Sequence, residues 1–75
     1  MDKFLKLIAE LMETEMELTP ETEYRKMEEW DSLTVISFLA MVDVEYDKTL
    51  RVADVRDTHT LQDLYDVVQK AAAHA

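Results

Sequence analysis

The chain has 75 residues, which is enough for one small domain, 1–75, with a modest core, because so short a chain buries only about 60% of its unfolded surface. A deep catalytic cleft is not expected in such a domain. The 17 acidic and 8 basic residues give a formal net charge of -9, which would repel nucleic acid and anionic membranes. Cysteine is absent, which excludes disulfides, thiolate metal ligands and a cysteine nucleophile.

The N-terminal segment alternates charged and apolar residues, unlike the basic start and unbroken apolar stretch of a secretion signal. No apolar run is long enough to cross a bilayer. These two features predict a cytoplasmic protein. The acidity favours partners with basic surfaces, although it could also serve only to keep a small domain soluble.

The first helix is predicted over residues 2–14. Phe4, Leu7, Ile8 and Leu11 recur at intervals of three and four residues, with charged residues between them. This spacing is typical of an amphipathic helix whose apolar stripe packs against a core.

The segment 15–30 is predicted to be a long ordered loop. Its periodicity is not helical, and Pro20 interrupts any helix there. Single apolar residues alternate with acidic ones, among them Leu18, Tyr24 and Met27. We expect these three side chains to pin the loop to the core.

The second helix is predicted from Ser32 to Tyr46. Asp31 and Ser32 are both good acceptors for the unpaired amides of a first helical turn, so either residue could cap this helix. Residues 47–49 are expected to end it. Because the chain contains no glycine, its helices must end on residues such as Asp, Lys and Thr.

Two shorter helical segments follow. Residues 50–56 have room for a helix of only one or two turns, and Thr60 and Asp63 form a capping-box pattern that starts a last helix. This helix is predicted to end near Ala73. The apolar residues at helical spacing in it are Leu61, Leu64, Tyr65, Val68 and Ala72. The whole pattern predicts an all-α fold, a small four-helix bundle with three main helices, a short third helix and a long loop between the first and second.

The second helix has two apolar stripes when successive residues are placed 100° apart. The stripe suited to the core comprises Val35, Phe38, Leu39, Val42 and Tyr46. The second stripe comprises Leu33, Ile36, Ala40 and Val44, flanked by Asp43 and Asp47. The polar or mixed strip that remains comprises Thr34, Ser37, Met41 and Glu45. The second stripe is either covered by the loop or the short third segment, or it stays exposed as a docking surface.

Ser32 stands at the head of this helix, where a serine most often acts only as a cap. Nucleophilic catalysis would need a positioned base, and the only histidines are His59 and His74, so a catalytic triad is not expected. A phosphate attached at Ser32 would lie where free backbone amides and the positive end of the helix dipole favour an anion. Asp31 opposes that attraction and could instead hold a divalent cation while the phosphate is installed.

The stretch Trp30-Asp31-Ser32-Leu33, followed by an apolar helix, resembles the Asp-Ser-Leu site of acyl carrier proteins, whose serine receives 4'-phosphopantetheine from coenzyme A. Length, acidity, helix order, the long first loop and the short third segment agree with this family over essentially the whole chain. The segment 29–33 resembles stand-alone carriers in particular, including D-alanyl carrier proteins and carriers of specialised lipid or polyketide pathways.

The resemblance implies that Ser32 is the attachment site of a covalent 4'-phosphopantetheine, and that Asp31 and Leu33 contact the phosphopantetheinyl transferase. The residues implied to face partner enzymes are Ile36, Ala40, Asp43, Val44 and Asp47. The chain would then be a non-catalytic carrier and a substrate of the transferase.

The resemblance also implies a role in fatty acid, polyketide or related lipid biosynthesis. The cofactor thiol would hold acyl intermediates as thioesters and present them to acyl-loading and acyl-processing enzymes with basic docking surfaces. The carrier is expected to be a monomer that binds no nucleic acid, membrane or metal.

The chain departs from the family in two places. Glu29 and Trp30 stand where the family often has a glycine shortly before Asp-Ser-Leu, and Thr34 and Ser37 replace acidic residues common early in the second helix. The second change argues against binding to the standard fatty-acid enzymes, which recognise that acidic patch. The alternative function is an unmodified acidic helical protein-interaction module in which Ser32 only caps the helix.

Overall fold

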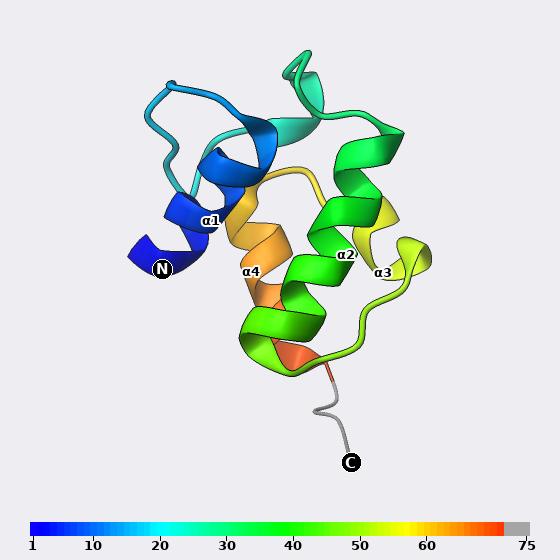
Figure 1. The fold of residues 1–75 in the computed structure, drawn as a ribbon. Coiled ribbons are helices and arrows are strands. Elements are labelled where there is room, and N and C mark those ends of the chain that lie inside the picture. Colours follow the sequence, from blue (N-terminus) through cyan, green and yellow to red (C-terminus); the bar gives the residue numbers. More distant parts are fainter. Residues whose placement is uncertain (72–75) are drawn as a thin grey trace.

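A computed structural model of the chain describes residues 1–71, which form four α-helices and one 3-10 turn joined by loops (Figure 1). The helices are α1 (Asp2–Met12), α2 (Ser32–Tyr46), α3 (Val52–Arg56) and α4 (Leu61–Lys70). The turn η1 (Tyr24–Lys26) lies in the loop between α1 and α2. The predicted fold, with three main helices, a short third helix and a long first loop, is confirmed.

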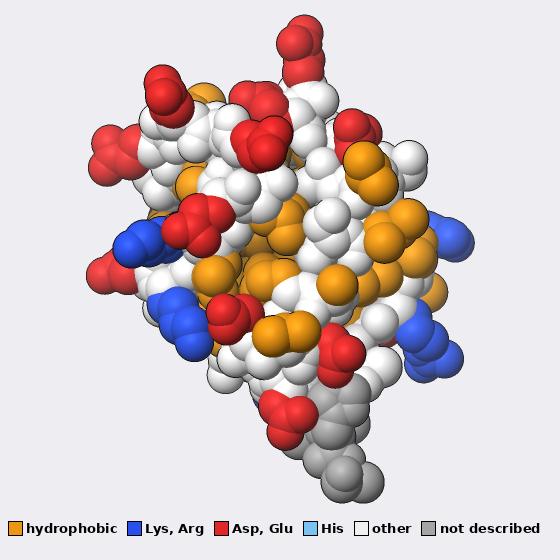
Figure 2. Space-filling model, viewed as in Figure 1, with side chains coloured by type: hydrophobic (Ala, Val, Ile, Leu, Met, Phe, Trp, Pro, Cys, Tyr) orange, Lys and Arg blue, Asp and Glu red, His pale blue; other side chains and the backbone are white. Residues whose placement is uncertain are grey.

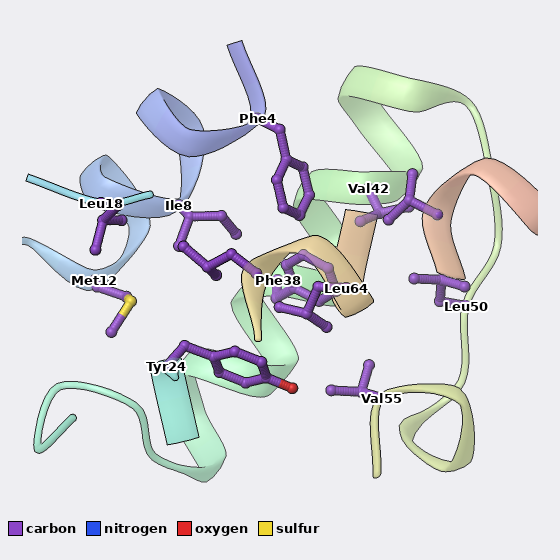
Figure 3. Packing of buried hydrophobic residues seen from close by; sticks show 12 residues of the cluster. Phe4, Ile8, Met12, Leu18, Tyr24, Phe38, Val42, Leu50, Val55 and Leu64 are labelled. Carbon is purple, nitrogen blue, oxygen red and sulfur yellow. The ribbon is translucent and has the colours of Figure 1, made fainter. Parts of the chain in front are cut away.

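The core is formed by the inward faces of the four helices together with the first loop (Figure 3). Phe4 makes edge contacts with Phe38, Tyr46 and Tyr65, at ring-centroid distances of 6.2, 6.2 and 5.2 Å. Burying one such side chain stabilises the fold by about 1.5–3 kcal/mol. The buried apolar residues are Phe4, Ile8, Met12, Leu18, Tyr24, Phe38, Val42, Leu50, Val55, Leu61, Leu64 and Val68.

The loop between α1 and α2 is held by its own apolar side chains, as predicted. Leu18 and Tyr24 are buried in the core, and Met27 packs against it. The hydroxyl of Tyr24 is hydrogen-bonded to the hydroxyl of Thr58, which in turn donates to the carbonyl of Val55 at 2.7 Å. Burial raises the pKa of Tyr24, so this hydroxyl remains a neutral partner of Thr58.

Backbone bonds connect the same loop to the start of α4. The amide of Leu61 donates to the carbonyl of Thr22 at 3.1 Å, and the amide of Gln62 donates to the carbonyl of Pro20 at 2.8 Å. The first amides of a helix have no partner inside the helix, so the loop supplies acceptors that α4 cannot.

The predicted capping box at the head of α4 is confirmed. The Thr60 hydroxyl accepts from the amide of Asp63 at 3.2 Å, and the Asp63 carboxylate accepts from the amides of Thr60 and His59 at 3.1 and 3.0 Å. These hydrogen bonds lower the pKa of Asp63.

The C-terminal end of α4 falls earlier than the sequence predicted. The helix ends at Lys70, because Ala71 already has extended backbone angles. The predicted end at Ala73 lies outside the described residues, as do Ala72 and His74.

Two helices end on residues in the left-handed conformation, although neither residue is glycine. Glu13 after α1 and Asp47 after α2 both have φ of 54°. Glu13 therefore ends α1 at Met12 rather than near residue 14 as predicted, and the amide of Thr14 donates to the carbonyl of Ala9 at 3.1 Å. The left-handed conformation lets backbone amides bond to the last carbonyls of a helix. For a residue with a Cβ, it is about 1–2 kcal/mol less favourable than the right-handed conformation.

Glu13→Gly should raise the free energy of unfolding by about 0.5–1 kcal/mol. Glycine adopts the left-handed conformation without the Cβ clash, a gain partly offset by the greater freedom of its unfolded chain. Urea unfolding followed by circular dichroism measures this change. The control Glu10→Gly lies inside α1 and should lower the free energy of unfolding by about 1 kcal/mol; a loss of stability in both variants would contradict the prediction.

Candidate functional site

The head of α2 is built around the carboxylate of Asp31. Oδ1 of Asp31 accepts from the amide of Thr34 at 2.9 Å, which makes Asp31 the cap of the helix. Ser32 follows as the first helical residue and is exposed. Of the two residues that the sequence allowed as the cap, Asp31 therefore caps the helix and Ser32 does not.

Thr34 reinforces this cap from inside the protein. Its hydroxyl lies 3.0 Å from Oδ1 of Asp31 and donates to the carbonyl of Glu29 at 2.9 Å. The side chain is buried, whereas the sequence analysis placed it on the polar strip of the helix. That placement was wrong because Glu29 and Asp31 supply hydrogen-bond partners that allow a threonine to point inward.

Trp30 attaches the residues before the site to the core. Its ring makes edge contacts with Tyr24 and Phe38, with centroid distances of 4.4 and 6.1 Å. The side chain is half-buried against the core cluster. The chain therefore enters α2 along a fixed path, and Ser32 has a defined position at the surface.

The Ser32 hydroxyl has no hydrogen-bond partner among the described residues. No hydrogen bond therefore joins a basic side chain of residues 1–71 to this hydroxyl, and the observed bond of His59 is made by its backbone amide to Asp63. His74, the other histidine, lies outside the described residues. What the site offers is an exposed hydroxyl at a helix N-terminus, where the helix dipole favours an attached anion.

Asp31 is held in its charged form by the bonds that make it a cap. The hydrogen bond from the Thr34 amide is the largest cause that lowers its pKa, followed by the bond from the Thr34 hydroxyl. The divalent-cation role suggested for Asp31 thus competes with a structural one. Within residues 1–71, no group of three or more His, Asp or Glu side chains is arranged to hold a metal ion.

The inner face of α2 packs on the core largely as predicted. Phe38 and Val42 are buried, while Val35, Leu39 and Tyr46 are partly buried. Thr34 joins this face, and Met41, which was predicted on the polar or mixed strip, is partly buried.

The second apolar stripe of α2 remains uncovered. The exposed fractions are 70% for Leu33, 62% for Ile36 and 80% for Val44, and Ala40 between them is exposed as well. Neither the first loop nor α3 covers the stripe, and hydrophobic side chains gather along this face of the molecule (Figure 2). An exposed apolar patch of this kind is typical of a docking surface.

Acidic residues lie at both ends of this stripe. Asp43 and Asp47 are exposed at its C-terminal end, and Glu28 and Glu29 are exposed just before the cap. The first turn of α2 itself carries no acidic residue. The predicted site residues thus form one continuous surface along α2, with Ser32 near one end.

Comparison with known proteins supports the fold. No family model and no curated protein matches the chain. Among solved structures, the solution NMR structure of the holo acyl carrier protein from Geobacter metallireducens is similar, with a TM-score of 0.75 and 23% sequence identity. The similarity covers 92% of this chain and 80% of that one. The chain therefore has the fold of an acyl carrier protein.

The cap on α2 makes stability depend on pH. Because the pKa of Asp31 is lowered in the folded state, its contribution is present above the unfolded pKa of about 3.9 and is lost as the pH falls through the folded pKa. Asp31→Asn keeps an amide-binding cap but does not titrate. Between pH 5 and about pH 2.5, urea midpoints should therefore fall less in Asp31→Asn than in the wild type.

A second capping carboxylate provides the matched comparison for this experiment. The pKa of Asp63 is lowered by the amides that it caps, so Asp63→Asn should reduce the acid-induced loss of stability in the same direction. Parallel urea midpoints for wild type and Asp31→Asn across this pH range would contradict the role assigned to the α2 cap.

Proposed function

We propose that the chain is an acyl carrier protein whose Ser32 bears a covalent 4'-phosphopantetheine arm. The observation that carries this proposal is that Asp31, and not Ser32, caps α2. The Ser32 hydroxyl is exposed and is not needed as the cap of the helix. The similarity in fold to a holo acyl carrier protein supports the same function.

The residues at this site fit the attached group. A phosphate ester on Ser32 would be exposed to solvent and would stand at the N-terminus of the 15-residue helix α2, where the dipole stabilises a negative charge. Its installation would join the Ser32 oxygen to the phosphate of coenzyme A that bears the pantetheine and would break the phosphoanhydride bond. The adenosine bisphosphate half leaves, and the proton of the Ser32 hydroxyl is released. When bound, the arm supplies a terminal thiol that carries acyl groups as thioesters.

The chain's own residues would present the arm rather than perform chemistry. Asp31, Thr34 and Trp30 fix the position of Ser32, and the protein itself would be a non-catalytic substrate of the transferase. Asp31 and Leu33, the neighbours of the attachment site, are proposed to contact that transferase.

Acyl-loading and acyl-processing enzymes would dock along the exposed stripe of α2. Ile36, Ala40 and Val44 offer apolar contacts, while Asp43 and Asp47 would meet basic groups on the partner. Weak docking steered by charge suits a carrier because it must leave each enzyme again. We assign such a carrier to fatty acid, polyketide or related biosynthesis and propose that it acts as a cytoplasmic monomer. As a separate finding, no helix within residues 1–71 is long and apolar enough to cross a membrane.

An unmodified interaction module is the second candidate function. The exposed stripe of Leu33, Ile36 and Val44 would serve it equally well, because docking through a helix face needs no covalent arm. The two functions differ in whether Ser32 accepts the arm.

Incubation with coenzyme A and a broad-specificity phosphopantetheinyl transferase should increase the intact mass of the wild-type chain by one phosphopantetheinyl group. Ser32→Ala should abolish this gain while changing stability by no more than about 0.5 kcal/mol, because the hydroxyl has no partner in the described part of the chain. Ser37→Ala is the matched control, since Ser37 is the chain's other serine and is exposed on the same helix. An unchanged wild-type mass, or a gain in Ser32→Ala, would contradict the proposal.

Leu33→Ala should slow this modification about fivefold or more, because a proposed contact with the transferase is lost. Its free energy of unfolding should stay within about 0.5 kcal/mol of the wild type, since Leu33 is exposed. The measurement is the kcat/KM of the transferase, followed by mass spectrometry. Met16→Ala removes a comparably exposed apolar side chain from the first loop and should leave the rate unchanged; equal slowing in both variants would argue against docking on α2.

A further inference from the structure

A small pocket lies between α2 and α3, close to the end of α2 that carries Ser32. Its volume is about 130 Å³, and the side chains that line it are Arg25, Trp30, Val35, Val52, Val55 and Arg56. Val35 follows Ser32 by three residues, and residues at this spacing share a face of a helix. An arm on Ser32 would therefore start on the side of α2 that borders the pocket.

The pocket is apolar along most of its lining but has little capacity. Trp30 and the three valines supply hydrocarbon surface, and Val52 is 51% exposed although it is apolar. The volume is small for a ligand pocket, since such pockets typically measure about 300–1,000 Å³. It suits a short acyl group, whereas most of a long acyl chain would remain outside.

Two of the chain's three arginines line this pocket. Nη1 of Arg25 donates to the backbone carbonyls of Arg56 and Thr58, which fixes the guanidinium at the pocket. The side chain of Arg56 is exposed, and only its carbonyl takes part in that bond. A guanidinium presents paired N–H donors that match a carboxylate.

The acidic residues in and just after α3 border a different pocket. Asp54 of α3 and Asp57, which follows the helix, line a hollow shared with Asp63 and Asp66 of α4. In addition, Oδ2 of Asp54 accepts from the amide of Arg51 at 2.8 Å. The side of α3 that faces α2 thus carries arginine, in a chain whose net charge is -9, so an anionic group near Ser32 would be attracted to this pocket.

We infer that this pocket receives a short acyl group that ends in a carboxylate. The valines would contact its methylene groups, and Arg56, supported by Arg25, would pair with its carboxylate. The inference rests on the proposed function and narrows the cargo to short dicarboxylic acyl groups. It also excludes a D-alanyl cargo from the pocket, because the arginines would repel its ammonium group.

Two cargoes that differ only in the terminal carboxylate test this inference. Wild type, Arg56→Gln and Lys6→Gln would be loaded on Ser32 from analogues of succinyl- and butyryl-coenzyme A in which an amide replaces the thioester. Both acyl groups have four carbons. Lys6→Gln is the matched control, because it removes the same charge from an exposed site on α1.

The succinyl form of the wild type should melt about 4 °C above the butyryl form at low salt. This difference should disappear in Arg56→Gln and persist in Lys6→Gln. In NMR spectra, the Nε–H signal of Arg56 should shift in the succinyl form relative to the butyryl form.

Equal melting temperatures of the succinyl and butyryl forms would overturn the inference. An equal rise of both forms over the unmodified chain would also overturn it, because the anion bound would then be the phosphate of the arm. Failure of the transferase to add any arm to the wild type gives a different result: it would overturn the proposed function, and this inference with it.

Discussion

The hydrogen bond from the Thr34 amide to the Asp31 carboxylate determines how the head of α2 is used. A helix needs an acceptor at its start, and the acidic side chain supplies it. The inward Thr34 hydroxyl then ties Asp31 to the carbonyl of Glu29, while Trp30 binds the preceding loop to the core. Ser32 is consequently placed by its neighbours, and its hydroxyl makes no hydrogen bond within residues 1–71. The proposed tether point depends on this arrangement.

The small size of the protein explains why one apolar stripe of α2 stays exposed. Three other helices and one loop cannot surround a central helix, so α2 buries Phe38 and Val42 and leaves Leu33, Ile36 and Val44 in solvent. The stripe lies on the same helix as Ser32, so an enzyme that docks on it would also have the proposed arm within reach.

The sequence predicted the helices well because their apolar spacing, the capping pattern at Thr60 and the break at Pro20 are local signals. It could not choose between Asp31 and Ser32 as the cap, since both residues satisfy the same local pattern. The burial of Thr34 depends on the Glu29 carbonyl, which only the folded loop brings into place. The pocket beside α2 joins side chains from the first loop, α2 and α3, so no pattern in consecutive residues reveals it.

The free hydroxyl of Ser32 also affects when the protein can be modified relative to its folding. A position that contributes nothing to internal bonding can be altered at any time after synthesis. On the proposed function, the newly made chain could fold completely before it meets the transferase, and removal of the arm would leave the same folded scaffold ready for another. The enzymes that act on the protein would then set the timing of modification, because folding imposes no order of its own.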